Sequence, residues 1–163
     1  MRSQTRSAVA IIGRVFNIVN RGMILEKIAN IELVQLVLEE QPFTRLIGAY
    51  LHDIDEHKVD LRVEIRPELL QQHGFVHGGV ISYLADNSLT IAGGLVLGPK
   101  VVTGEYKINY LRPAIGGILS ARAYAISQGK TQAVCRCDIV SINKDAEKVV
   151  AVAQGTINLL REV

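Results

Sequence analysis

Residues 73–88, HGFVHGGVISYLADNS, combine residue types that could act together on a carbonyl group. A helix that begins near Gly78 and Gly79 leaves its first backbone N–H groups without helical partners. Glycine lets a ligand approach that backbone closely, and the helix dipole favours negative charge at this end. The start of the helix could therefore stabilise the oxyanion that develops from a carbonyl oxygen. His77 stands at its entrance, where it could donate to the same oxygen or fix the loop.

Asp86 lies nine residues after His77, which corresponds to roughly 13 Å along one helix. A single chain cannot easily bring both side chains to one small reacting group over that distance. Two copies of the helix, paired antiparallel about a twofold axis, could place Asp86 of one chain beside His77 and Gly78 of the other. The spacing therefore predicts a site that is shared between two chains.

The same residues also have ordinary structural interpretations. Gly78 and Gly79 could permit close packing of the preceding loop on a sheet, because neither carries a side chain. His77 could be a loop histidine with satisfied hydrogen bonds, and Asp86 could pair with a backbone amide. Each explanation is adequate for one residue taken alone, but the combination at this spacing favours a functional site.

Hydrophobic periodicity predicts the elements that hold these residues. Residues 3–40 have helical spacing in two pieces that break near residues 20–22, which predicts a helical extension over residues 1–45. A hairpin of strands at 46–55 and 58–65 follows, and then a helix at 80–97 in which Gly93 and Gly94 are a weakening or C-terminal signal. Further strands are predicted at residues 100–113, 116–128, 130–143 and 148–160. Because no dinucleotide-type glycine pattern occurs, the simplest fold is α+β, with an antiparallel sheet packed on one long helix.

The composition fits one globular domain and excludes several classes of function. The chain has 163 residues, a net charge of +2, 5% aromatic residues and no tryptophan. This balance argues against a protein that binds nucleic acid. No apolar run reaches the ~18 residues of a membrane-spanning helix. No arrangement of His, Cys, Asp and Glu predicts a metal site, so we expect no metal and no cofactor.

Two further features concern the compartment and the N-terminus. Cys135 and Cys137 have no second pair with which to bind zinc, and we interpret them as reduced core thiols of a cytoplasmic protein. Residues 1–22 are basic and contain serine, like a leader, but Arg14 interrupts the apolar run and no A-x-A-like cleavage site follows. We expect an amphipathic helix docked on the domain, with a membrane-surface or partner-binding helix as the alternative.

Two motifs carry a resemblance to a known family. HGFVHGGVISYLAD has an acid nine positions after the histidine of HGG, and the strand that follows contains T-x-E-x-K-x-N-Y-x-R-P. With the order of elements over residues 46–161, these motifs resemble the hotdog-fold acyl-CoA thioesterases, in the phenylacetate-pathway-like (PaaI-type) branch of the hydroxybenzoyl-CoA thioesterase superfamily. The resemblance implies a hotdog domain over residues 46–163, in which an antiparallel sheet wraps around the long helix and the N-terminal helices are an addition.

The resemblance implies a role for each matching residue. Asp86 would be the general base that activates water, or the nucleophile, and the Gly78 N–H would bind the thioester carbonyl oxygen. His77 would polarise or orient that carbonyl, and Thr103 would assist the water or the carboxylate. Gln71 stands where the family commonly has the asparagine that holds substrate or water, so the amide is retained on a longer arm.

The resemblance also implies how the substrate and a second chain would bind. Gly79 would contact the substrate, and Arg112 and Lys130 fall where basic residues of the family often meet the CoA phosphates. The sites would lie between the chains of a homodimer, and members of this branch often form tetramers. The apolar residues of the site helix favour a medium- or long-chain fatty acyl-CoA over an aryl-acyl-CoA.

Three functions remain open from the sequence, beside a purely structural domain without a ligand. The first is hydrolysis of acyl-CoA to the free acid and CoA. The second is a hotdog protein that binds acyl-CoA as a sensor without turnover, and the third is a hydratase or dehydratase that acts on acyl thioesters. The spacing of His77 and Asp86 is that of the hydrolases, which argues against the hydratase or dehydratase. The N-terminal helices lack a clear basic recognition helix, which argues against the sensor. Hydrolysis is therefore the preferred prediction.

Overall fold

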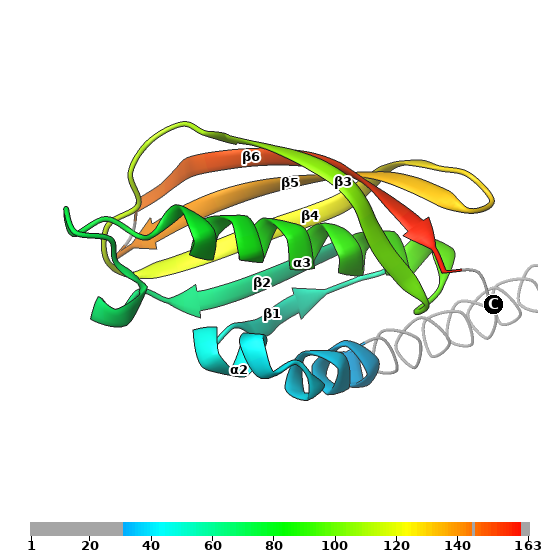
Figure 1. Ribbon diagram of the computed structural model, residues 1–163, viewed down its shortest axis with the longest axis horizontal. Helices are drawn as coiled ribbons and strands as arrows, with labels where there is room; N and C mark the ends of the chain where they lie inside the picture. The colour runs from blue at the N-terminus through cyan, green and yellow to red at the C-terminus, as the bar shows by residue number, and fades with distance from the viewer. Residues whose placement is uncertain (1–30, 145, 161–163) are drawn as a thin grey trace, which may run out of the picture.

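A six-stranded antiparallel sheet wraps around one long helix in the computed structural model, which describes residues 31–144 and 146–160 (Figure 1). Residues 31–40 are helical, and the strands lie in the order β1-β2-β4-β5-β6-β3 across the sheet. The other elements are α2 (Pro42–Ile47), β1 (Tyr50–Ile54), β2 (Lys58–Glu64), a 3-10 turn (Pro67–Leu69), α3 (Gly78–Leu97), β3 (Val101–Tyr110), β4 (Ile118–Gln128), β5 (Gln132–Asn143) and β6 (Ala146–Leu159). This arrangement confirms the predicted α+β hotdog architecture.

The segment before the sheet differs from the predicted hairpin. The hydrophobic pattern predicts a strand from residue 46, whereas β1 begins at Tyr50 and the residues before it form α2. Pro42 occupies the first turn of α2, where its missing N–H costs nothing, and Gly48 ends the helix with a positive φ of 77°. The predicted boundary between residues 45 and 46 falls within α2. The helix and the break predicted within residues 1–30 lie outside the described residues.

The central helix α3 continues through both of its late glycines. It spans Gly78–Leu97 and ends at Gly98, so Gly93 and Gly94 are not its C-terminal signal. Gly93 is required by packing, because a Cβ there would stand 2.5 Å from the Ile157 side chain on β6. The buried apolar residues of α3 are Val80, Ile81, Leu84, Ala85, Leu89, Ile91 and Ala92.

By length and composition alone, α3 is the one described helix that could cross a membrane. Half of its most apolar window is buried inside the protein, and the helix packs against β2, β3, β4, β5 and β6. Those contacts account for its apolar surface. We therefore regard α3 as the core helix of a globular domain.

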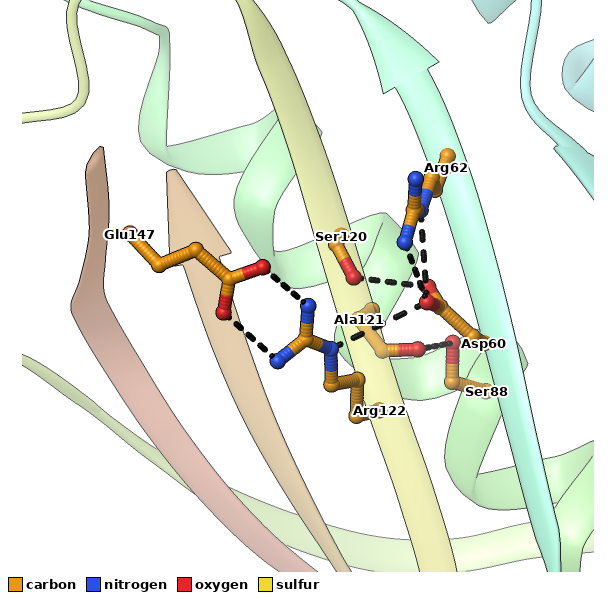
Figure 2. A network of polar contacts seen from close by, with 7 residues as sticks. All are labelled: Asp60, Arg62, Ser88, Ser120, Ala121, Arg122 and Glu147. Carbon is orange, nitrogen blue, oxygen red and sulfur yellow. Dashed lines mark hydrogen bonds and ion pairs between the residues drawn. The ribbon is translucent and has the colours of Figure 1, made fainter. Parts of the chain in front are cut away.

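A network of charged side chains ties three strands together, on the side of the sheet that faces away from α3 (Figure 2). Arg122 of β4 makes hydrogen bonds of 2.7 and 2.9 Å to the Glu147 carboxylate of β6 and an ion pair of 3.8 Å with Asp60 of β2. Asp60 also accepts from the Ser120 hydroxyl at 2.7 Å and pairs with Arg62 at 2.9 Å. The hydrogen bonds that the Arg122 guanidinium donates to the Glu147 carboxylate raise the pKa of Arg122. The network therefore helps to fix the register of the strands that support α3.

Burial of the two cysteines generates a prediction about their reactivity. Cys135 and Cys137 on β5 are free thiols with no exposed surface. Burial raises the pKa of the Cys135 thiol to about 11 and raises the pKa of Cys137 further. Because the thiolate is the reactive form, we expect a chromogenic thiol reagent at pH 8 to label neither cysteine in the folded protein and both in concentrated urea. Rapid labelling of the folded protein would contradict this packing.

Candidate active site

The side chain of His77 caps the N-terminus of α3. Its Nδ1 accepts a hydrogen bond of 2.9 Å from the Gly79 N–H, which satisfies one of the donors left free at a helix start. A neutral imidazole that accepts at Nδ1 carries its proton on Nε2, so the Nε2–H is left to donate to another group. Gly79 leaves room for this ring, because a Cβ at Gly79 would stand 3.0 Å from His77 Nδ1.

Gly78 keeps a free backbone donor at the same end of α3. Its N–H has no hydrogen-bond partner in the part of the chain that the structure describes, whereas its carbonyl accepts from the Tyr110 hydroxyl at 3.1 Å. A Cβ at Gly78 would meet the Tyr110 ring at 3.6 Å, which is an ordinary contact. Packing within the chain therefore does not demand glycine here. What the glycine offers is close approach to an N–H at the positive end of the helix dipole.

Asp86 lies half-buried two turns further along α3, where a hydroxyl group from the edge strand holds it. The Thr103 hydroxyl on β3 donates to Asp86 Oδ1 at 2.7 Å. Thr90 Oγ1, one turn after Asp86, stands 2.6 Å from Thr103 Oγ1 and 2.9 Å from the Asp86 carbonyl oxygen. Because Thr103 gives its single proton to the carboxylate, its oxygen can only accept, and the single proton of the Thr90 hydroxyl is shared between Thr103 Oγ1 and the Asp86 carbonyl oxygen. Asp86 Oδ2 has no hydrogen-bond partner among the described residues.

A β-bulge lets β3 present two side chains to α3. The pairing of β3 with β6 shifts register between Thr103 and Glu105. The partly buried positions are therefore three residues apart, at Thr103 and Tyr106, rather than two. The Tyr106 hydroxyl lies 2.5 Å from that of Ser82 on α3, and Ser82 and Asp86 are one turn apart on the helix. Because of the bulge, Thr103 and Tyr106 on β3 stand opposite Asp86 and Ser82, which are one turn apart on α3.

Gln71 lies in a tight turn before α3. Its side-chain oxygen accepts from the His73 N–H at 2.8 Å, and its backbone N–H donates to the Phe75 carbonyl at 2.8 Å. The His77 N–H donates to the Leu69 carbonyl at 2.8 Å, which ties the start of this loop to the start of the helix. The amide nitrogen of Gln71 has no partner among the described residues, so its N–H groups are free to donate to another group.

The two halves of the predicted site are not brought together within one chain. Gly78 and Asp86 lie in the unbroken helix α3, eight residues apart, which corresponds to about 12 Å. A single carbonyl group cannot contact both the Gly78 N–H and a water molecule held by Asp86 over that distance. Within one chain, the free Gly78 donor and the Asp86 carboxylate therefore cannot act on the same carbonyl group.

Arg112 and Lys130 are exposed and lie near opposite ends of α3. Arg112 closely follows Tyr110, whose hydroxyl bonds the start of the helix. Lys130 closely follows Gln128, whose side chain donates to the Val96 carbonyl near the end of the helix. A helix of 20 residues is about 30 Å long, so the two cations of one chain do not converge on one phosphate group.

Sequence reasoning missed the residues that support Asp86 from either side. The sequence motifs do not point to Ser82, Thr90 or Tyr106, although each makes a hydrogen bond between α3 and β3. A signal for them exists in the sequence, because small and polar residues recur at every fourth position of α3. The repeat consists of Gly78, Ser82, Asp86, Thr90 and Gly94. Residues four apart form a ridge on a helix surface, and this ridge faces the edge strand.

Comparison with known proteins identifies the family. The thioesterase superfamily matches residues 73–161, which is more than half of the chain and includes both α3 and β3. The chain belongs to the thioesterase superfamily. We therefore describe it as a thioester hydrolase, and the match includes every predicted site residue except Gln71.

Individual relatives of this thioesterase agree with the assignment. It is 28% identical over 113 residues to the 1,4-dihydroxy-2-naphthoyl-CoA hydrolase of Listeria monocytogenes, covering 68% of this chain and 89% of that protein. It is 29% identical over 133 residues to the acyl-coenzyme A thioesterase 13 of Homo sapiens, covering 78% of this chain and 92% of that protein. The PaaI protein from the phenylacetic acid degradation operon of E. coli superposes with a TM-score of 0.69 at 26% identity, covering 77% of this chain and 89% of that chain. The resemblance to the phenylacetate-pathway-like branch is thereby confirmed.

The His77 cap gives a prediction that does not depend on turnover. His77→Ala removes the Nδ1 acceptor and is expected to lower the free energy of unfolding by about 1 kcal/mol, measured by urea titration. His77→Asn should retain most of the stability, because asparagine is among the best N-cap residues, although it lacks the Nε2–H donor. An equal loss in both variants would show that the imidazole acts by packing and not as a cap.

Proposed function

We propose that the thioesterase hydrolyses acyl-CoA, with a medium- or long-chain fatty acyl group, to the free acid and CoA. Asp86 is the general base, and the Gly78 N–H is the donor to the thioester carbonyl oxygen. The observation that carries the proposal is that α3 holds an unpaired N–H at its start and a carboxylate with one unpaired oxygen further along, among the described residues. Membership of the thioesterase superfamily supports the reaction type.

The proposed reaction uses these groups in turn. Asp86 Oδ2 takes a proton from water as the water oxygen attacks the thioester carbon, while Thr103 keeps Oδ1 fixed. The carbonyl oxygen becomes an oxyanion that accepts from the Gly78 N–H and the His77 Nε2–H. Collapse of this intermediate expels CoA as a thiolate and leaves the carboxylic acid, and the proton on Asp86 then passes to the thiolate or to solvent, which restores the base. Attack by Asp86 itself, through an anhydride that water then hydrolyses, is the alternative.

We also propose that two chains complete each site. The separation of Gly78 and Asp86 along α3 supports this arrangement, and so does the position of β3 at one edge of the described sheet. An edge strand has backbone groups free to pair with a second chain. Antiparallel pairing about a twofold axis would bring Asp86 of each chain opposite Gly78 of the other. Arg112 and Lys130 that meet one CoA would then come from different chains, and a tetramer is the alternative assembly.

Substitutions at Asp86 and Thr103 test the catalytic roles. Asp86→Asn keeps the shape of the side chain but removes the base, so we expect a loss of about a hundredfold or more in kcat for thiol release from acyl-CoA. Thr103→Val removes the donor to Asp86 Oδ1 and should lower kcat by about tenfold.

The control is Thr156→Val, which should leave kcat unchanged because the Thr156 hydroxyl donates to the exposed Glu105 and not to Asp86. Full turnover by Asp86→Asn would exclude Asp86, and acyl-CoA binding without turnover by the wild type would indicate the sensor.

Mixed dimers test whether the site is shared. Gly78→Pro removes the N–H donor, and proline suits this first helical position because His77 has the extended ψ of 134° that proline requires of its neighbour. Dimers of Gly78→Pro alone or Asp86→Asn alone should be inactive. Coexpression of the two in equal amounts should restore about a quarter of the wild-type activity, since half of the random dimers contain one intact site of two.

Gly78→Ala is the matched control for the mixed dimers, because it adds a Cβ but keeps the N–H. It should lose less activity than Gly78→Pro and should complement Asp86→Asn at least as well. If coexpression restores no activity while both variants fold and dimerise, the two groups act within one chain and the shared site is wrong.

A further inference from the structure

A cavity of about 330 Å³ opens beside the second half of α3. Three stretches line it: the helical residues 31–40 with Gln41, the part of α3 from Asn87 onward, and the loop that leads from α3 to Val101 at the start of β3. Its apolar side chains are Leu33, Val34, Val37, Ile91, Leu95 and Val101. No aromatic side chain and no charged side chain lines it among the described residues. The volume falls in the range of small-molecule sites, and the aliphatic lining favours an alkyl group over an aromatic ring.

The polar side chains at one end of the cavity form hydrogen bonds with one another. Gln41 Oε1 accepts from the Thr44 hydroxyl at 2.6 Å and from the Asn87 amide at 3.2 Å. The Asn87 amide also donates to the Tyr83 hydroxyl at 3.0 Å, and that hydroxyl donates to Thr44 at 2.6 Å. This closed ring ties α2 to α3. The ring uses the donors of Thr44, Tyr83 and Asn87 and leaves the Gln41 amide nitrogen at this end of the cavity. The aliphatic remainder of the cavity offers water few partners and suits an apolar ligand.

The cavity adjoins the candidate active site through Thr90. Thr90 lines the cavity, and its hydroxyl lies 2.6 Å from that of Thr103, which donates to Asp86. Asn87, the residue after Asp86, lines the cavity as well. An acyl group whose thioester carbon stands at Asp86 would therefore direct its tail past Asn87 and Thr90 into the cavity.

We propose that this cavity holds an unbranched acyl tail of medium length, and that residues 31–40 and Gly94 set the length it accepts. The inference rests on the proposed hydrolysis at Asp86. Between Asn87 and Gly94 the helix advances about 10 Å, and Gly98 and Pro99 line the cavity beyond that point. A tail of medium length fills this space, whereas a longer tail has to displace the wall.

Gly94 has space beside it for a larger side chain, whereas the neighbouring Gly93 has none. A Cβ at Gly94 would meet only Val101, at 3.5 Å, which is an ordinary contact. A Cβ at Gly93 would collide with Ile157. A larger side chain at Gly94 is therefore accommodated by filling the cavity that this residue lines. Leucine also has a higher helix propensity than glycine, so we expect Gly94→Leu to fold.

A chain-length series from acetyl-CoA to palmitoyl-CoA tests the proposal. For the wild type, kcat/KM should rise by about fourfold with each methylene until the cavity is full, and then level off or fall. Gly94→Leu should lower the ratio of kcat/KM for decanoyl-CoA to that for acetyl-CoA by about tenfold or more, with Gly94→Ala in between. A ratio that stays unchanged in Gly94→Leu, with an unchanged thermal midpoint, would overturn the proposal.

Leu33 and Leu36 are a matched pair for the role of residues 31–40. Both are partly exposed, at 43% and 56%, but Leu33 lines the cavity and Leu36 does not. Leu33→Ala should lower the decanoyl-to-acetyl ratio by about threefold or more, because the tail loses apolar contact. Leu36→Ala should leave the ratio unchanged. If both variants change the ratio equally, residues 31–40 do not form the wall that selects the tail.

Direct binding of decanoate separates this inference from the proposed hydrolysis, because calorimetry needs no turnover. If the wild type binds decanoate, Gly94→Leu binds it about tenfold more weakly or worse, and neither releases thiol, the cavity takes an alkyl chain and the hydrolysis is wrong. If the wild type releases thiol at a rate that does not depend on tail length and binds no decanoate, the hydrolysis stands and the cavity proposal is overturned.

Discussion

The contact between one ridge of α3 and the edge strand β3 is the interaction on which the site depends. Three pairs form it along the strand: Gly78 with Tyr110, Ser82 with Tyr106, and Asp86 with Thr103. A helix ridge repeats every four residues and a strand face every two. The bulge between Thr103 and Glu105 adds one residue to the strand, so that both Thr103 and Tyr106 face the helix. A strand of regular register would turn either Thr103 or Tyr106 away from the helix.

The hydrogen bonds of this ridge allow the Asp86 carboxylate to be partly buried while one of its oxygens stays free. A carboxylate on a core helix is costly unless its oxygens are bonded, yet a base needs one oxygen free for water. Thr103 satisfies one oxygen of Asp86, and Thr90 in turn supports Thr103. In the described part of the chain no buried side-chain nitrogen or oxygen lacks a hydrogen-bond partner. The polar groups of the ridge are thus accommodated within an otherwise apolar core.

The parts of the structure that could be predicted are those with a local signal. The start of α3 was evident from HGG, and the strands were evident from alternation, because each pattern reflects the period of its own element. The bulge beside Thr103 could not be predicted, since a glycine within a strand signals equally a bulge or a close approach. The six residues of α2 are too few to show a helical period. The cavity depends on where residues 31–40 pack, and no local pattern encodes that position.

The segments that hold the proposed catalytic residues and the segment that encloses the cavity are separate in the chain. Asp86 and Thr103 belong to α3 and β3, whereas Leu33 and Val37 belong to a helix that precedes the sheet. Both of these wall residues are partly exposed, so their replacement removes little from the core. Descendants of this chain could therefore diverge in the size of the ligand they admit, through changes in residues 31–40, while the contact between helix and strand is inherited intact.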